Sequence, residues 1–311
     1  MIKIPTSNKY IEGDVMSYSN TKVCYSINGL IEHAKAKQGR LTLSVSNNFL
    51  DLNWFPNGSN NLLIFFSASV ARTQKTVLPV FSGTGAIGKV NANILMIADP
   101  SLHLSDDLTL AWYSGNENND LQGLLGNTLK IFSDYFGKNR TILYGGSSGG
   151  FASIYYSTYI PGSLPVAVNP QTDISKYYKK FSVKYLTTCF PDILVDNDIE
   201  KGFLSTGIDY DVIPRFTQSY NKLIYLQNES DDHHIKNHLE PFLRKQGLKD
   251  INQKENVFPI SERILLVKGK EWGEGHKPPP KKFIFYLLQL LINEEDNLCS
   301  KVKELYINLI I

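Results

Sequence analysis

The sequence predicts an α/β fold with a mostly parallel central sheet and helices on both of its faces. Its strand candidates are continuous apolar runs, as strands covered on both faces require, and segments with apolar residues at helical spacing separate them. The same fold class is indicated by residues 141–152, where a predicted strand passes directly into a predicted helix through a turn of small residues. The clearest strand candidates are residues 61–70, 93–98, 141–144, 222–227 and 263–268.

Residues 1–60 are expected to form an antiparallel lead-in that belongs to the same domain as residues 61–311. Short strand-like runs at 22–27 and 41–46 alternate there with polar turns. No residue pattern in this segment points to chemistry.

The segment between the second and third strong strands predicts a turn and a helix. Asp99 ends one strand directly before Pro100, where a turn or cap role is more common than a functional one. Apolar residues then recur at helical spacing through residues 120–136, and Gly137 stops the pattern. This amphipathic helix leads the chain into the strand at 141–144.

Residues 141–152, TILYGGSSGGFA, combine a buried strand, a turn of glycine and serine, and a helix start. This order matches the nucleophile elbow Gly-x-Ser-x-Gly, in which a strained backbone presents a serine between neighbours that must lack bulk. The following helix N-terminus directs free N–H groups toward a developing oxyanion. Both Ser147 and Ser148 fit the pattern, and a glycine-rich turn that binds phosphate is the alternative interpretation.

Two later segments offer partners for such a serine. Asp231 follows the strand at 222–227, and His276 lies in a glycine-rich loop after the strand at 263–268, directly before a run of prolines. Parallel strands present their carboxyl ends at one edge of a sheet, and the chain order serine, acid, histidine is that of the α/β-hydrolase triad. We therefore predict an α/β-hydrolase fold with Asp231 as acid and His276 as base. Alternative acids are Asp173, Glu229 and Asp232.

The strand at 61–70 ends in small residues, and in this fold the loop after such a strand supplies an oxyanion-hole N–H. Ser67 and Ala68 are candidates through their backbone, with the Ser67 side chain as a further donor. The other donor is the N–H that follows the nucleophile, which is Ser148 if Ser147 attacks. An ordinary strand end is the alternative interpretation.

His234 and His238 are spaced i, i+4, the geometry of a two-histidine metal face on a helix. No glutamate occupies the position between them that a zinc protease requires. Polar residues at a helix start, capped by Asp231 or Asp232, explain the segment more economically. We therefore expect no metal.

Residues 174–221 lack a strong strand and are rich in tyrosine, phenylalanine, lysine and aspartate. In this fold an insertion that covers the substrate commonly lies here, so we expect a helical cap. Four of its aromatic residues could stack on sugar rings, although packing within the cap is the more common role. They are Tyr177, Tyr178, Phe181 and Tyr185.

The composition indicates a soluble globular protein of the cytoplasm. Hydrophobic residues make up 42% of the 311 residues, charged residues make up 20%, and the net charge of +2 implies no nucleic-acid or other polyanionic partner. Three dispersed cysteines, Cys24, Cys189 and Cys299, argue against a disulfide framework. The start of the chain lacks a signal-peptide core, and apolar runs such as 283–292 are too short to span a membrane.

From about Leu62 to the C-terminal helix, the chain resembles an α/β-hydrolase family associated with bacterial surface glycans. Its members include capsule and polysialic-acid O-acetyltransferases and hydrolase-like accessory-Sec secretion proteins. The resemblance implies Ser147 as nucleophile, with Asp231 as acid and His276 as base. It rests on the segments 63–68 (LIFFSA), 98–100 (ADP), 111–113 (AWY), 144–150 (YGGSSGG), 169–172 (NPQT) and 225–228 (YLQN), on Asp231 and His234, and on Gly275-His276.

The activity expected from these residues is acyl transfer through an acyl-enzyme. The resemblance favours O-acetylation of a surface glycan with acetyl-CoA as donor and no bound cofactor. Two alternatives stay open, an esterase that uses water as acceptor and a non-catalytic partner protein of a glycan assembly or export system. The acyl group and the substrate-binding residues are not predicted.

Overall fold

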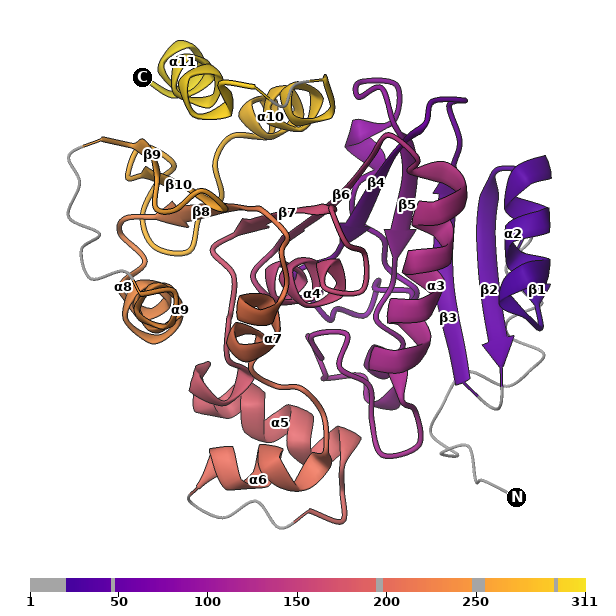
Figure 1. Cartoon of the computed structure of the whole chain (residues 1–311). Coiled ribbons are helices and arrows are strands. Elements are labelled where there is room, and N and C mark those ends of the chain that lie inside the picture. Colours follow the sequence, from indigo (N-terminus) through magenta and orange to yellow (C-terminus); the bar gives the residue numbers. More distant parts are fainter. Residues whose placement is uncertain (1–20, 46–47, 194–197, 248–254, 294–295) are drawn as a thin grey trace.

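The computed structural model describes residues 21–45, 48–193, 198–247, 255–293 and 296–311 (Figure 1). A single sheet with the strand order β1-β2-β3-β5-β4-β6-β7-β8-β10-β9 runs through it. The strands from β5 to β10 in this order are mutually parallel, which confirms the predicted α/β class. They are β4 (Asn61–Phe66), β5 (Asn93–Ile97), β6 (Arg140–Gly146), β7 (Leu164–Val168), β8 (Leu223–Asn228) and β10 (Ile264–Gly269).

The strands at the sheet edges include antiparallel pairs. β3 (Asn48–Phe55) is antiparallel to both β2 (Gly39–Val45) and β5. The outermost strand β1 (Thr21–Cys24), however, is parallel to β2, because helix α2 (Ile27–Ala36) crosses between them and returns the chain to the same end. At the other edge, β9 (Val257–Pro259) pairs antiparallel with β10.

Adjacent residues of the central strands point to opposite faces of the sheet and pack into two separate hydrophobic cores. Each face is covered, which explains why these strands are apolar along their whole length. On β6, Leu143 belongs to the core shared with α3 (Leu121–Phe136) and α4 (Ser148–Ser157). Its neighbour Ile142 belongs to the opposite core, which contains apolar residues of α10 (Lys281–Asn293) and α11 (Leu298–Ile310). Helices therefore cover both faces, as predicted, and Figure 1 shows α10 and α11 on the side of the sheet away from α4.

The connection from β7 to β8 is helical, like the expected cap. Figure 1 shows α5 and α6 projecting beyond α7, away from the sheet. The aromatic residues of the cap differ in exposure. Tyr185 is buried against Trp112 and Phe203, whereas Tyr178 is 44% exposed. The cap elements are η3 (Ile174–Lys176), α5 (Lys179–Cys189), α6 (Ile199–Thr206) and α7 (Val212–Gln218).

Short elements complete the chain. After β8 follow α8 (Asp232–His234), a π-helical turn η4 (Ile235–Leu239) and α9 (Glu240–Lys245), and two 3₁₀ turns, η1 (Thr84–Ala86) and η2 (Pro100–Leu104), flank β5. Asp99 caps η2 by accepting the Ser101 N–H, which agrees with its predicted cap role. Within the described ranges, no helix has the length and apolarity needed to cross a membrane.

Candidate active site

The elbow places Ser147 at the tip of a strained turn between β6 and α4. Ser147 has φ 55° and ψ −119°, a conformation that L residues rarely adopt, and α4 begins at the next residue. A Cβ on Gly145 would lie 2.0 Å from the carbonyl oxygen of Gly149, whereas one on Gly146 would meet nothing closer than 3.6 Å. A Cβ on Gly149 would lie 2.7 Å from the Phe66 carbonyl oxygen, so both glycines two residues from Ser147 are crowded by backbone. Of the two glycines that flank Ser148 in the same way, Gly150 is crowded but Gly146 is not, which favours Ser147 over Ser148 as the nucleophile.

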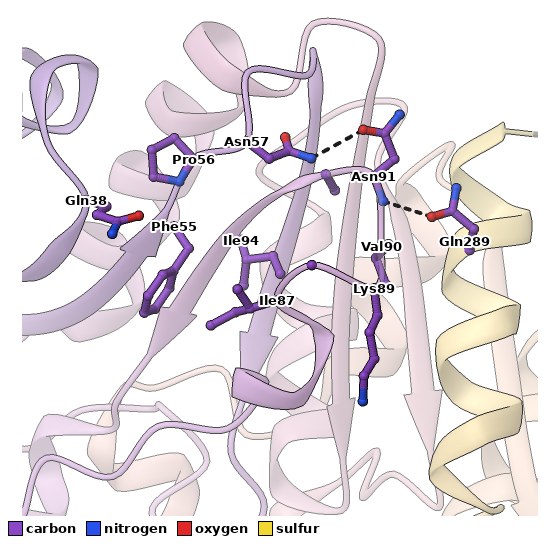
Figure 2. Close-up of a pocket in the computed structure, with 12 residues that line it drawn as sticks. Gln38, Phe55, Pro56, Asn57, Ile87, Lys89, Val90, Asn91, Ile94 and Gln289 are labelled. Carbon is purple, nitrogen blue, oxygen red and sulfur yellow. Dashed lines mark hydrogen bonds between the residues drawn. The ribbon is translucent and has the colours of Figure 1, made fainter.

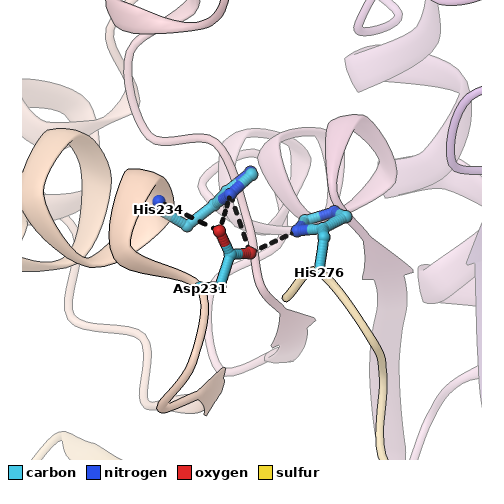
Figure 3. Close-up of side chains that lie close together, drawn as sticks. All are labelled: Asp231, His234 and His276. Carbon is cyan, nitrogen blue, oxygen red and sulfur yellow. Dashed lines mark hydrogen bonds and ion pairs between the residues drawn. The ribbon is translucent and has the colours of Figure 1, made fainter. Parts of the chain in front are cut away.

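Asp231 and His276 meet at the same sheet edge. Asp231 follows β8, is 5% exposed, and accepts a hydrogen bond from His276 Nδ1 at 2.5 Å (Figure 3). With Nδ1 as donor, Nε2 of His276 carries the lone pair that a general base requires. Burial raises the pKa of the Asp231 carboxyl, but hydrogen bonds from His234 and His276 outweigh it and hold the pKa well below its usual value.

The loop that carries His276 is anchored by side-chain amides. Asn228 Nδ2 donates to the carbonyl oxygens of Gly273 at 2.8 Å and Lys277 at 3.1 Å. Asn169 Nδ2 donates to the same Lys277 oxygen at 3.1 Å, and its Oδ1 accepts the N–H of Asn228 at 2.7 Å. The asparagines at the ends of β7 and β8 therefore hold the loop that carries His276.

The alternative acids have other partners. Asp173 caps η3 by accepting the Ser175 N–H at 2.8 Å, and Glu229 pairs with Lys268 at 3.0 Å. Asp232 lies exposed at the start of α8. Asp231 is the carboxylate that His276 reaches.

Gln171 contacts Ser147 directly, a contact that the sequence did not predict. Its Nε2 donates to Ser147 Oγ at 2.8 Å and lies 2.8 Å from His234 Nε2. Its Oε1 accepts from Trp112 Nε1 at 3.2 Å. The sequence signal for this residue was the segment 169–172 (NPQT), which contributed to the family resemblance but was not assigned a role.

His234 lies beside His276 and shares its carboxylate. The side chain is 1% exposed, its Nδ1 lies 3.0 Å from Asp231 Oδ1, and its ring stacks on that of His276 with a centroid distance of 4.1 Å. Burial lowers the pKa of His234 to about 4, so the ring is neutral near pH 7.

His234 and His238 have different partners in the structure. His238 Nδ1 accepts the N–H of Thr172 at 3.3 Å, while His234 turns toward Asp231, which caps α8 as expected. In the described part of the chain, the residues that could bring metal ligands together are Asp231, His234 and His276, with ligand atoms within 4.8 Å of one another. Both imidazole Nδ1 atoms in this cluster face the carboxylate, so hydrogen bonding explains the arrangement.

The cap contributes Tyr177. Burial raises the pKa of Tyr177 to about 12, although an interaction of its hydroxyl with the Ser147 side chain lowers it. Its ring packs against that of His234 at a centroid distance of 5.7 Å. The base of the cap therefore forms one wall of the site.

The oxyanion-hole prediction needs one correction. Ser148 is the first residue of α4, where the N–H has no intrahelical acceptor. The N–H of Ser67, in contrast, donates to Tyr113 Oη at 2.7 Å, and its Oγ reaches the Val80 carbonyl oxygen at 3.5 Å. Ser67 thus has no free N–H here, and the exposed Ala68 is the remaining candidate in that loop.

A pocket of about 370 Å³ lies elsewhere, near the amino end of β5 (Figure 2). It is lined by residues near the end of β3 and the start of β5, among them Phe55 and Ile94. Hydrogen bonds link Asn57 to Asn91 at 3.3 Å and Asn91 to Gln289 at 2.8 Å. Because the triad residues follow the carboxyl ends of the strands, this pocket is not part of the candidate active site.

No protein-family model matches the chain, and no curated protein matches it in sequence. Solved structures do match. The capsule O-acetyltransferase of Neisseria meningitidis serogroup A is 14% identical over 81% of this chain and 94% of its own, with a TM-score of 0.54. A mutant of that enzyme solved in complex with CoA matches at 15% identity and the same TM-score of 0.54.

Two further solved structures with different functions are also similar to the chain. An acylaminoacyl peptidase of Pyrococcus horikoshii is 11% identical over 89% of this chain and 46% of its own, with a TM-score of 0.54. A glycosylation-associated protein complex of Streptococcus agalactiae is 13% identical over 74% of this chain and 42% of its own, with a TM-score of 0.51. The chain therefore has the α/β-hydrolase fold, with a mostly parallel sheet, helices on both faces and a helical insertion between β7 and β8.

Proposed function

We propose that the protein is a serine-dependent acyltransferase with the triad Ser147, Asp231 and His276. The observation that carries this proposal is the 2.5 Å contact between His276 Nδ1 and the buried Asp231, formed at the sheet edge where Ser147 adopts the elbow conformation. His276 Nε2 takes the proton of Ser147 as Oγ attacks an ester or thioester carbonyl carbon. Asp231 orients the imidazole and stabilises its charged form.

The tetrahedral oxyanion is received by backbone donors. The N–H of Ser148 and the N–H of Ala68 are the candidates, because the Ser67 N–H is bonded to Tyr113. Collapse of the intermediate expels the leaving group, which takes the proton from His276. The acyl group then remains on Ser147 until an acceptor hydroxyl attacks.

We propose acetyl-CoA as donor and the hydroxyl of a bacterial surface glycan as acceptor. The structural likeness to a capsule O-acetyltransferase that binds CoA supports this choice. A pocket of about 640 Å³ also supports it, since Lys236 and Lys245 line it, together with the carboxyl groups of Asp173 and Asp211, the second of which interacts with Lys245. Such cations suit the phosphates of CoA. Ester hydrolysis differs only in that water is the acceptor.

Mass spectrometry after brief exposure to acetyl-CoA or p-nitrophenyl acetate tests the proposal. We expect an acetyl adduct on Ser147, lost in Ser147→Ala and retained in Ser148→Ala. An adduct that follows Ser148 would reassign the nucleophile. Absence of adduct and turnover in the wild type would favour a non-catalytic partner protein, a function that the likeness to a glycosylation-associated complex keeps open.

A chelator distinguishes the triad from a metal centre at Asp231, His234 and His276. Because the proposed steps use only side chains and backbone N–H groups of the protein, turnover should be unchanged by EDTA. Activity that EDTA removes and zinc restores would instead identify these residues as ligands.

A further inference from the structure

We propose that His234 and Gln171 form a positioning relay that connects Asp231 to Ser147 along a second path, beside the one through His276. The inference rests on the proposed acyl transfer and adds two residues that act on the nucleophile without touching the substrate. Two contacts build it, His234 Nδ1 to Asp231 Oδ1 at 3.0 Å and Gln171 Nε2 to His234 Nε2 at 2.8 Å. A third, Gln171 Nε2 to Ser147 Oγ at 2.8 Å, completes it.

The donors and acceptors of the relay fit together in one way. The Asp231 carboxylate accepts only, so His234 Nδ1 must carry the proton that faces it. In a neutral imidazole the other nitrogen, Nε2, is then an acceptor, and it must receive a hydrogen from Gln171. Gln171 Oε1 is held by the Trp112 indole N–H at 3.2 Å, which fixes the amide with its NH₂ group toward the site.

This arrangement sets the direction of the Ser147 hydroxyl hydrogen. The second hydrogen of the Gln171 amide points at Ser147 Oγ, so Oγ is an acceptor on that side. The hydrogen of Ser147 is therefore turned away from Gln171 and remains available to the general base. The relay thus prepares the proton transfer that begins catalysis.

The surroundings hold the relay in place. His234 and Gln171 are 1% and 0% exposed. The His234 ring is stacked on that of His276 at 4.1 Å with an interplanar angle of 26°. A buried, stacked ring with both nitrogens engaged has little freedom to rotate, so His234 fixes both the carboxylate and the plane of the base.

Two substitutions of His234 test its two contacts in the relay one at a time. In His234→Asn the amide can keep the donor at the Nδ1 position but cannot reach Gln171. In His234→Gln the amide oxygen can keep the acceptor at the Nε2 position and the donor to Asp231 is lost. We expect each change, and Gln171→Leu, to lower kcat by about 10- to 100-fold with little change in KM. His233→Gln, at the adjacent position, is the matched control and should retain wild-type kcat.

The double variant provides the decisive measurement. If the residues act through one path, His234→Asn combined with Gln171→Leu should lose no more activity than either single change. Multiplied losses, or wild-type kcat in Gln171→Leu, would overturn the relay. Because these rates are compared with a wild-type activity that Ser147→Ala abolishes, the proposed function itself can stand when the relay fails.

A spectroscopic readout does not depend on turnover. Both imidazole Nδ1–H groups on Asp231 should give downfield proton resonances in the NMR spectrum of the resting protein. His234→Asn should remove one of them and retain the other, whereas Ser147→Ala should retain both. A spectrum in which His234→Asn removes neither would show that His234 does not donate to Asp231.

Discussion

Gly145 and Gly149 touch across the elbow so closely that a Cβ on Gly145 would lie 2.0 Å from the Gly149 carbonyl oxygen. The partner atom belongs to the backbone and cannot rotate away. The contact makes the packing of β6 against α4 dependent on the absence of one methyl group.

Alanine should therefore have different effects at the adjacent positions Gly145 and Gly146. We expect Gly145→Ala to lose activity and to unfold at a lower temperature, because strand and helix must move apart. Gly146→Ala is the control, since a Cβ there has 3.6 Å of space. Thermal unfolding and p-nitrophenyl acetate turnover measure the difference, and equal behaviour of the two variants would contradict the elbow geometry.

Asp231→Asn should lower kcat by about 10⁴-fold, because the amide favours the wrong tautomer of His276. Asp232→Asn, one residue along and exposed, should retain activity. Steady-state kinetics on an activated ester provide the measurement. A large loss in Asp232→Asn with Asp231→Asn active would move the acid to the adjacent position.

Asn228→Ala should release the loop that presents His276. Loss of the donors to Gly273 and Lys277 permits a displacement of the base, and a shift of about 1 Å can cost roughly 100-fold in rate. Asn256→Ala removes a comparable bond, to the Lys268 carbonyl oxygen at 3.0 Å, outside this loop, and should be nearly silent. Unchanged kcat in Asn228→Ala would show that the loop is positioned by other contacts.

Removal of the cations at Lys236 and Lys245 should raise KM for acetyl-CoA and leave KM for p-nitrophenyl acetate unchanged. The reason is that only the first donor carries phosphates. A variant with Lys281 and Lys282 changed to alanine removes the same charge from α10, which packs on the opposite face, and serves as control. Equal effects in the two variants would indicate long-range attraction in place of a phosphate site.

His234 should make stability depend on pH. Its pKa falls from 6.5 to about 4 on folding because it is buried, so between these values the unfolded chain binds a proton that the folded chain does not. The wild type should therefore lose stability as pH falls from 6.5 to 4, by roughly 1.4 kcal/mol per pH unit from this group. His234→Asn lacks this contribution. Urea unfolding across this range should show its stability approaching that of the wild type at low pH, and a constant difference would contradict burial of a neutral histidine.

The sheet and the triad candidates were predictable because each depends on local pattern. Continuous apolar runs indicated β4, β5, β6, β8 and β10, and chain order linked Asp231 and His276 to the elbow. The parallel pairing of β1 with β2 was not predictable in this way, because it depends on the crossing of α2 between the two strands.

The supporting residues were harder to predict because their roles depend on tertiary contacts. Nothing local to Gln171 reveals that Ser147 lies 2.8 Å from its amide. The Ser67 N–H was misassigned for the same reason. Its acceptor, Tyr113, lies 46 positions along the chain and reaches it through a backbone with φ 58°.

The segment where the cap leaves β7 is joined directly to the candidate active site. Gln171 and Tyr177, where the insertion leaves β7, both contact Ser147, and Thr172 is bonded to His238 just beyond β8. The insertion is thus fastened at its root to Ser147 and to the segment that follows β8. A displacement of this root would be transmitted to Ser147 through Gln171, whereas α5 and α6 project away from the sheet (Figure 1).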